Sequence, residues 1–286
     1  MNTTTDASSE ALRASMVDHI MNAGHARSAR VEEAIRTIPR HLFVPAASVE
    51  DAYADIAVIT KRDSDGAALS CASVPTVVAM MLDQLDVRPG NRILEIGAGT
   101  GYNAALLAHL TGPSGQVTTV DIDGEVTAHA RQALDATGHS HVHVITRDGA
   151  LGAEENAPYD RIIFTVGAWD LPPTFWNQLA PDGRLVVPLR WRGQTRSVAF
   201  IREGDRLRSD SLELCGFVPM IGQEGEHTGH IDADRQVALF WDADQAVDLT
   251  SLHGVLNTPK TEIWSQVTVG GNESFDGIWL RLTDTE

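Results

Sequence analysis

Hydrophobic residues in the first part of the chain recur at the spacing of α-helices. The residues concerned are Leu12, Met16, Ile20, Val31, Ala34, Ile35 and Ile38. Because residues three or four apart share one helix face, the pattern predicts two amphipathic helices, separated near Gly24. Residues 1–10 are polar and lack this spacing, so we expect a disordered tail there.

From residue 92 onward, short apolar runs alternate with helical patterns. The expected strands are 92–96, 116–120, 142–146, 159–166 and 185–188, and the expected helices are 102–110, 125–137 and 174–179. Antiparallel strands are expected at 197–202 and 206–214. The alternation predicts a doubly wound, mostly parallel α/β sheet of the Rossmann-like kind. Ligands of such sheets bind beyond the carboxyl ends of the strands.

The segment between the first helices and this sheet is less regular. Residues 52–72 follow neither the helical nor the strand period, and we expect irregular structure there. Pro75 suits the first turn of a helix, and apolar residues from Val78 to Leu85 continue that helix.

A glycine-rich loop directly follows the expected strand 92–96. The run is Glu95-Ile-Gly97-Ala-Gly99-Thr-Gly101, and the next strand ends in Asp121. Glycines allow a tight turn and close approach of a ligand, and an acid at the end of the second strand can accept hydrogen bonds from ribose hydroxyls. Because the spacing departs from the G-x-G-x-x-G of dinucleotide enzymes, the pattern favours S-adenosylmethionine over a nicotinamide cofactor. The alternative is a glycine-rich turn followed by an incidental acid.

Composition limits the class of protein. The chain has 286 residues, is 43% hydrophobic and carries a net charge of −17, which argues against nucleic acid and anionic membranes as partners. Its start lacks a secretion signal and it has no apolar run long enough to span a bilayer, so a cytoplasmic location is expected. Cys71 and Cys215 form no C-x-x-C pattern, and the 11 histidines lack a matching carboxylate cluster, so no metal site is expected.

Residues 221–286 differ in charge from the rest. They contain 12 acidic and 3 basic residues, about half of the net charge. Apolar residues in strand-like settings nevertheless predict a packed α/β extension that caps the site or docks a peptide. These residues are Trp241, Trp264, Trp279, Leu280 and Leu282.

With these elements placed, residues 11–220 resemble the protein-L-isoaspartate O-methyltransferase family. The motifs that carry the resemblance are Ile38-Pro-Arg-His-Leu-Phe-Val-Pro45, Ala52-Tyr-Ala-Asp55, Arg92 to Tyr102, Thr146-Arg-Asp-Gly-Ala-Leu-Gly152, Tyr159 to Thr165, Leu171-Pro-Pro173, Gln178 to Pro188 and Phe217-Val-Pro219. The resemblance implies an S-adenosylmethionine-dependent class I methyltransferase domain over 11–220, with an N-terminal helical segment and a C-terminal extension. Arg147 stands where the family has the first glycine of a Gly-Asp-Gly loop.

The resemblance also implies roles for individual residues. The predicted cofactor-binding residues are Glu95, Gly97, Ala98, Gly99, Thr100, Gly101, Asp121, Ile122, Asp148, Gly149 and Thr165. Ser73, in Ser73-Val-Pro75, is the predicted substrate-orienting hydroxyl, with Ser70 as a second candidate; Ser73 could instead simply cap the following helix. The predicted substrate-binding residues are Tyr53, Asp55, Lys61, Arg62, Val166 and Gly167. For Lys61 and Arg62 the alternative is a solvated basic pair.

The chemistry expected of such a site needs few groups. A sulfonium methyl is already activated, and a carboxylate with an ordinary pKa near ~4 is already ionised at neutral pH, so no general base is required. The product is a methyl ester, which the next backbone nitrogen can attack to close an aspartimide ring. The altered loop 60–66 and the long extension resemble a branch of the family that modifies an Asp of a ribosomal precursor peptide.

The sequence therefore predicts a carboxyl O-methyltransferase acting on a peptide or protein that bears Asp or isoaspartate, with the precursor peptide as the preferred substrate. General repair of isoaspartyl proteins is the alternative. A module that binds peptide or cofactor without turnover is the alternative of another class, since a fold alone does not establish catalysis. Cofactor binding without methyl transfer would distinguish it from an enzyme.

Overall fold

The computed structural model describes residues 3–191, 193–223, 225–262, 264 and 268. The chain divides into two units, the first made of residues 1–190 and 195–223 and the second of residues 191–194 and 224–286. All the predicted site residues belong to the first unit.

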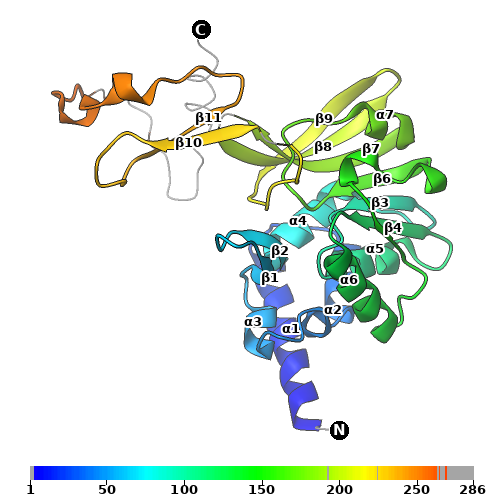
Figure 1. Ribbon diagram of the computed structural model, residues 1–286. Helices are drawn as coiled ribbons and strands as arrows, with labels where there is room; N and C mark the ends of the chain where they lie inside the picture. Colours follow the sequence, from blue (N-terminus) through cyan, green and yellow to red (C-terminus); the bar gives the residue numbers. More distant parts are fainter. Residues whose placement is uncertain (1–2, 192, 224, 263, 265–267, 269–286) are drawn as a thin grey trace. The chain divides into compact units, whose positions relative to one another are not determined.

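A seven-stranded sheet forms the centre of the first unit, in the order β5-β4-β3-β6-β7-β8-β9 (Figure 1). The strands are β3 (Arg92–Ile96), β4 (Gln116–Asp121), β5 (His143–Thr146), β6 (Tyr159–Phe164), β7 (Leu179–Trp191), β8 (Gln194–Glu203) and β9 (Arg206–Leu214). The pairs from β5 to β7 are parallel, and β8 pairs with β9 in antiparallel fashion. The predicted doubly wound, mostly parallel sheet is confirmed.

Helices cover this sheet. They are α1 (Thr3–Asn22), α2 (Ala29–Thr37), α3 (Val49–Tyr53), α4 (Pro75–Leu85), α5 (Tyr102–Thr111), α6 (Gly124–Ala136) and α7 (Pro173–Gln178), with 3-10 turns η1 (Arg40–Phe43), η2 (Gly149–Leu151) and η3 (Glu154–Asn156). Side chains of a strand alternate between its faces, so Ile93 joins an apolar cluster with α1, α2, α4 and α5, whereas Leu94 joins another with Phe175 of α7. Burial on both faces explains the near-continuous apolar runs of these strands.

The N-terminal region departs from the prediction in two places. Helix α1 begins at Thr3, within the segment expected to be disordered. Residues 52–72 include a hairpin of β1 (Val58–Arg62) and β2 (Ala68–Ala72), so the expectation of irregular structure was wrong there. The Asp63 carboxylate closes the turn by accepting hydrogen bonds from the backbone N–H groups of Asp65 and Ala67 at 3.0 and 2.8 Å. Register shifts in the pairing obscure the period-2 pattern that would have indicated strands.

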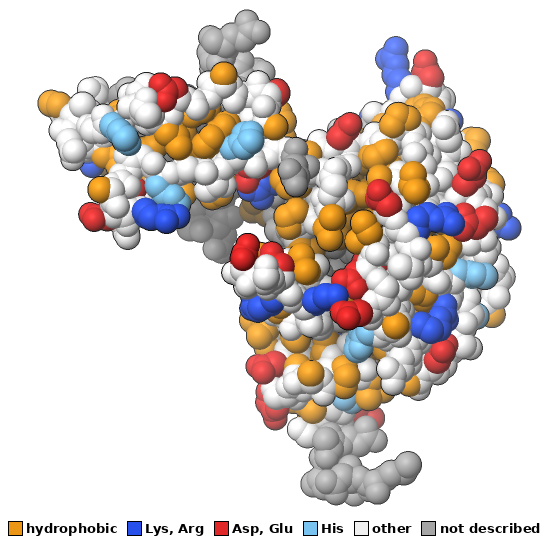
Figure 2. Space-filling view, viewed as in Figure 1, with side chains coloured by type: hydrophobic (Ala, Val, Ile, Leu, Met, Phe, Trp, Pro, Cys, Tyr) orange, Lys and Arg blue, Asp and Glu red, His pale blue; other side chains and the backbone are white. Residues whose placement is uncertain are grey.

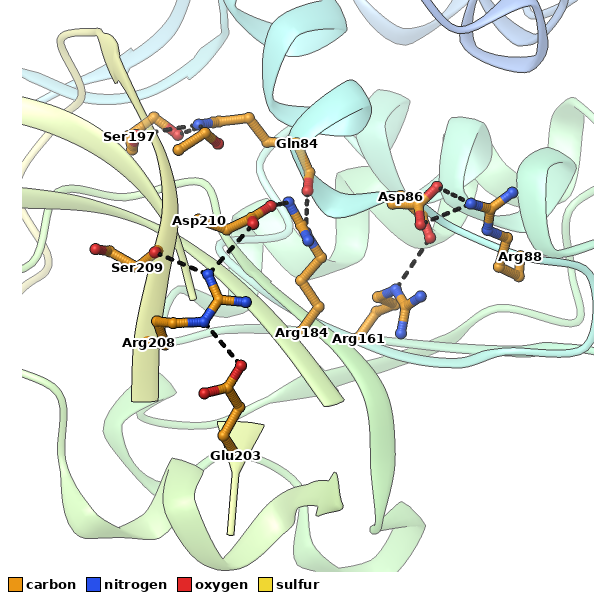
Figure 3. Close-up of polar contacts among 11 residues, drawn as sticks. Gln84, Asp86, Arg88, Arg161, Arg184, Ser197, Glu203, Arg208, Ser209 and Asp210 are labelled. Atoms are coloured by element: carbon orange, nitrogen blue, oxygen red, sulfur yellow. Dashed lines mark hydrogen bonds and ion pairs between the residues drawn. The ribbon is translucent and has the colours of Figure 1, made fainter. Parts of the chain in front are cut away.

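Polar contacts join α4 to the antiparallel end of the sheet (Figure 3). The Gln84 amide donates to the Ser197 carbonyl at 3.2 Å and accepts from the Ser197 hydroxyl at 2.6 Å. Arg184 of β7 donates to the Gln84 carbonyl and pairs with Asp210 of β9 at 2.5 Å. These contacts fix α4, whose first turn follows the predicted active-site serine.

The described part of the second unit contains a hairpin, β10 (Glu226–His230) and β11 (Ala238–Asp242), and two 3-10 turns, η4 (Leu249–Leu252) and η5 (Val255–Asn257). Trp241 lies in β11 as predicted, but Trp264 is outside any strand and 86% exposed. The predicted α/β character is therefore not found among the described residues of the extension, which include no α-helix. Trp279, Leu280 and Leu282 lie outside the described residues. Among the described residues, no helix combines the length and apolar character needed to cross a bilayer.

Candidate active site

A cavity lies at the carboxyl ends of β3, β4 and β6, where a parallel sheet binds its ligands. It brings together many of the residues predicted from the sequence. Those that line it are Ser70, Ser73, Glu95, Gly97, Ala98, Gly99, Thr100, Asp121, Thr165 and Val166. Most of the residues predicted to bind the cofactor, and both serines predicted to orient the substrate, thus line the same cavity.

The loop after β3 is shaped by its glycines. Gly97 has φ +100, and a Cβ built on it would lie 2.5 Å from the Thr165 hydroxyl oxygen. That hydroxyl donates to the Gly97 carbonyl at 2.6 Å, so the end of β6 is held against the loop. Gly101, with φ +83, packs against the backbone of Ala130 in α6 and does not line the cavity. The first glycine therefore allows Thr165 at the end of β6 to lie close to the loop, and the last one allows the loop to pack on a helix.

Glu95 is fully buried and only half satisfied. Strand alternation turns its side chain toward α5, where the Asn103 amide donates to Oε1 at 2.7 Å. Its other oxygen, Oε2, has no protein partner, although the residue lines the cavity. Burial raises the pKa of Glu95 to about 7, against an ordinary 4.5, and the nearby Thr119 hydroxyl and the Asn103 amide only partly offset this. Such an orphaned buried carboxylate oxygen needs a cationic or hydrogen-bonding ligand.

Asp121 at the end of β4 is held by the backbone. Its carboxylate accepts hydrogen bonds from the N–H of Gly99 at 3.2 Å and of Asp123 at 3.1 Å. Burial nevertheless raises the pKa of Asp121. The carboxylate lines the cavity beside the glycine loop, the position at which an acid can accept from ribose hydroxyls.

Ser70 lies in the middle of β2, and Ser73 lies between β2 and α4. The Thr60 hydroxyl donates to the Ser70 hydroxyl at 3.2 Å. Val74, not Ser73, is the N-cap residue of α4, and no side chain caps that helix. The alternative role of Ser73 as a helix cap is therefore not what the structure shows, and Ser73 remains a lining residue with a predicted substrate role.

Arg40 holds the backbone at Ala72 and Ser73 in place. This residue was not singled out from the sequence. The residue is fully buried, its guanidinium donates to the carbonyls of Ser73 at 2.9 Å and Ala72 at 3.2 Å, and it lies over the Tyr102 ring. Asn103 was also missed. A polar residue in an otherwise apolar helical run after a glycine loop was the available signal for Asn103, and a lone Arg within the largely apolar run 38–45 was the available signal for Arg40.

Besides Gly167, four predicted substrate-binding residues lie outside the cavity lining. The Asp55 carboxylate binds the backbone N–H and the hydroxyl of Thr76, at 2.9 and 2.8 Å, so it supports the first turn of α4. The Tyr53 hydroxyl lies 2.8 Å from His41 Nδ1. Arg62 donates to the Gly66 carbonyl within its own hairpin at 2.8 Å.

Lys61 is the fourth of these residues, and its ammonium binds two carboxylates. It lies 2.6 Å from Asp123 and 2.6 Å from Glu125, both at the start of α6. Figure 2 shows basic and acidic side chains adjacent on this part of the surface. These hydrogen bonds raise the pKa of Lys61 and lower that of Asp123. Lys61 therefore ties the β1–β2 hairpin to α6, and the carboxylate clamp expected of it would require these ion pairs to break.

The remaining predicted residues also lie outside the cavity lining. Ile122 is 45% exposed, and Asp148 caps η2 by accepting from the Ala150 N–H at 2.9 Å. A Cβ on Gly149 would lie 2.7 Å from Ile96, so this glycine allows close packing. Gly167 pairs through its backbone with Val218 and Met220.

In the described part of the chain, no three His, Cys, Asp or Glu side chains gather closely enough to hold a metal ion. The orphaned Glu95 oxygen instead fits the ammonium group of an amino-acid moiety, and Asp121 fits a ribose. Both features suit S-adenosylmethionine.

Comparison with known proteins agrees with this geometry. A family model described as protein-L-isoaspartate(D-aspartate) O-methyltransferase (PCMT) matches residues 11–225. The protein-L-isoaspartate O-methyltransferase of Methanopyrus kandleri is 40% identical over 215 residues, covering 74% of this chain and 92% of that protein. That of Methanoregula boonei is 40% identical over 213 residues, covering 74% of this chain and 94% of that protein.

Solved structures show the same fold. A protein-L-isoaspartate O-methyltransferase superimposes with a TM-score of 0.67 at 28% identity, covering 73% of this chain and 66% of that one. A Plasmodium falciparum protein described as belonging to the same class, solved with S-adenosyl-L-homocysteine, gives a TM-score of 0.63 at 18% identity, covering 72% of this chain and 96% of that one. The family match ends at residue 225, so nearly all of the second unit lies beyond it.

Proposed function

The chain belongs to the protein-L-isoaspartate(D-aspartate) O-methyltransferase family and is an S-adenosylmethionine-dependent carboxyl O-methyltransferase, and from that premise we propose that it methylates an isoaspartyl carboxylate in a peptide or protein. The observation that carries the proposal is the shared cavity. Ser70 and Ser73 face the same space as Glu95 and Asp121, so a substrate carboxylate and a cofactor can meet there.

Three parts of the chain bind and orient the cofactor in this proposal. The free Oε2 of Glu95 accepts from the cofactor ammonium, and Asp121 accepts from the ribose hydroxyls. Gly97 and Gly99 allow the ligand to lie against the backbone. When bound, the cofactor supplies an activated methyl group.

The chain's further contribution is alignment of the substrate. A carboxylate with a pKa near ~4 is ionised at neutral pH, so the site needs no group to remove a proton. The hydroxyls of Ser70 and Ser73 orient it by hydrogen bonds, while Arg40 fixes the carbonyls of Ala72 and Ser73. Catalysis then rests on holding the two reactants in line and on excluding water.

A second candidate substrate is a defined Asp in a dedicated precursor peptide. Two features of the chain favour it: the loop 60–66 departs from the family pattern, and the family match ends before an acidic extension. The curated relatives are named for isoaspartate, which is why the isoaspartyl substrate comes first.

The decisive test is transfer of labelled methyl from S-adenosylmethionine to two synthetic peptides that differ only in Asp or isoaspartate at one position. Labelling of the isoaspartyl peptide alone is the expected result. Labelling of the Asp peptide would favour the precursor-type substrate. Cofactor binding with no transfer to either peptide, or to a panel of Asp-containing basic peptides, would contradict turnover and favour a binding module.

A further inference from the structure

A second hollow opens beside the candidate active site, between the β1–β2 hairpin and the start of α6. It holds about 480 Å³, within the range of pockets that bind small ligands. Its walls are loop 44–47, four residues of β1 and the first turns of α6. We call this hollow the side groove.

The side groove adjoins the active-site cavity. Ser70 and Gly99 line both spaces. Glu95, Gly97 and Asp121, the residues that suit the cofactor, line the cavity but not the groove. A ligand in the groove would therefore lie next to the substrate serine but away from Glu95, Gly97 and Asp121.

The walls of the side groove are mainly aliphatic. Pro45, Ala46 and Ile59 are exposed wall residues, with Ile59 36% exposed, and the buried Val44 and Val126 lie behind the surface. The one lysine in the wall, Lys61, already binds Asp123 and Glu125. Because its charge is compensated, the groove is better suited to an apolar side chain than to an anion.

We propose that the side groove binds a large apolar side chain, aliphatic or aromatic, located within two residues of the methylated residue in the peptide substrate. This specificity rests on the proposed function, because it places the target carboxylate at Ser70 and Ser73. Neighbouring residues of an extended peptide rise about 3.3 Å each, so a chain leaving the cavity past Ser70 reaches the groove within that span. The side chain would gain affinity by leaving water.

The test combines peptides with a variant that fills the groove. Isoaspartyl hexapeptides with alanine flanks are compared with versions carrying one Phe or Leu at each position within two residues of the target. Ala46→Trp places a bulky ring in the groove from an exposed wall position. Ala136→Trp, at an exposed position at the end of α6 outside the groove lining, is the matched control. KM, kcat and the Kd of S-adenosylmethionine are measured for each.

For the unmodified chain and for Ala136→Trp, we expect about a tenfold lower KM for the best Phe or Leu peptide than for the all-alanine peptide. Ala46→Trp should remove this advantage while leaving the all-alanine peptide and the cofactor Kd within about twofold. Equal KM values for all peptides would overturn the inference and leave the proposed function standing. A weakened cofactor Kd in Ala46→Trp alone would also overturn it, since the groove would then belong to the cofactor. Absence of transfer to every peptide would overturn both.

Discussion

At the residue scale, the protonation of Glu95 should make cofactor binding in the cavity depend on pH. Its pKa of about 7 reflects burial, and the carboxylate must be ionised to bind a cofactor ammonium well. We expect the affinity for S-adenosylmethionine to rise as pH increases from 5.5 to 7.5, by about tenfold. Calorimetric titration across that range checks this. Glu95→Gln should bind more weakly at pH 7.5 and show a flatter pH profile, and an identical profile would contradict the assignment.

The same group makes a separate prediction about stability without cofactor. A raised pKa means that the folded state holds its proton more tightly than the unfolded chain, whose carboxyl titrates near 4.5. The resulting stabilisation, about 3 kcal/mol, is complete below pH 4.5 and is lost as pH rises through 7. The free energy of unfolding, measured by denaturant titration, should therefore fall between pH 5 and 7.5 relative to that of Glu95→Gln. A constant difference between the two proteins would contradict the prediction.

Ser73 and Asp121 should separate catalysis from cofactor binding. Ser73→Ala removes a hydroxyl on the substrate side and should lower kcat/KM for the peptide by about a hundredfold with the cofactor Kd unchanged. Asp121→Ala should weaken the cofactor first, by about tenfold or more. Methyl-transfer kinetics and cofactor titration on both variants check the pair. Equal loss of both properties in Ser73→Ala would remove the serine from its proposed role.

At this scale, the sequence predicted the positions of residues whose type is required by the local backbone geometry. Glycines at positive φ and an acid at a strand end are readable because the loop geometry requires them. Arg40 was missed because its partners are backbone carbonyls from residues 12 to 33 positions away, which no local pattern reveals. The contacts of Lys61 and Asp55 were not anticipated for the same reason, since both bind partners distant in sequence, and their substrate roles stay predictions.

At the scale of elements, the β1–β2 hairpin depends on Lys61 for its position. The ammonium binds Asp123 and Glu125 at the start of α6, and Asp123 in turn donates its N–H to Asp121. We expect Lys61→Met to loosen the hairpin and raise the peptide KM about fivefold with a smaller change in kcat. The KM of the unmodified chain should rise with salt more steeply than that of the variant, because ions screen an exposed pair.

Arg62→Met provides the control for this prediction. Arg62 is the next residue of β1, but its guanidinium bonds only to the Gly66 carbonyl of the same turn among the contacts that the structure describes. Its peptide KM should therefore stay within about twofold of the original value. A similar rise in both variants would show that general loss of positive charge, and not the tie to α6, governs the effect.

Elements with a clear period were predictable, and elements without one were not. The strands and helices between residues 92 and 214 follow strong alternation, and their bounds agree with the prediction to within a few residues, apart from β7, which begins earlier. The hairpin at 58–72 has shifted register and a polar turn, so its pairing could only be seen in three dimensions. Its strand β1 forms a wall of the side groove, and Ser70 of β2 lines both the groove and the cavity, so the groove could not be anticipated from sequence.

At the scale of the whole molecule, the two units differ in charge and in the apolar packing that the structure describes in each. The first unit contains the predicted site, the two large apolar clusters and nearly all of the family match. The second carries much of the negative charge of the chain, and its described residues form one hairpin and two short turns. A role in docking a basic peptide is consistent with that charge, because opposite charges accelerate encounter and raise affinity at low salt.

A chain that ends at residue 223 separates these contributions. Because both apolar clusters lie in the first unit, we expect the shortened protein to unfold cooperatively and to bind S-adenosylmethionine within about twofold of the full chain. If the extension docks a basic peptide, KM for a lysine-rich isoaspartyl peptide should rise about tenfold and lose its salt dependence, whereas a neutral peptide should be unaffected. Equal kinetics for both peptides would assign the extension no part in substrate binding. Loss of cofactor binding would show instead that the first unit needs the second in order to fold.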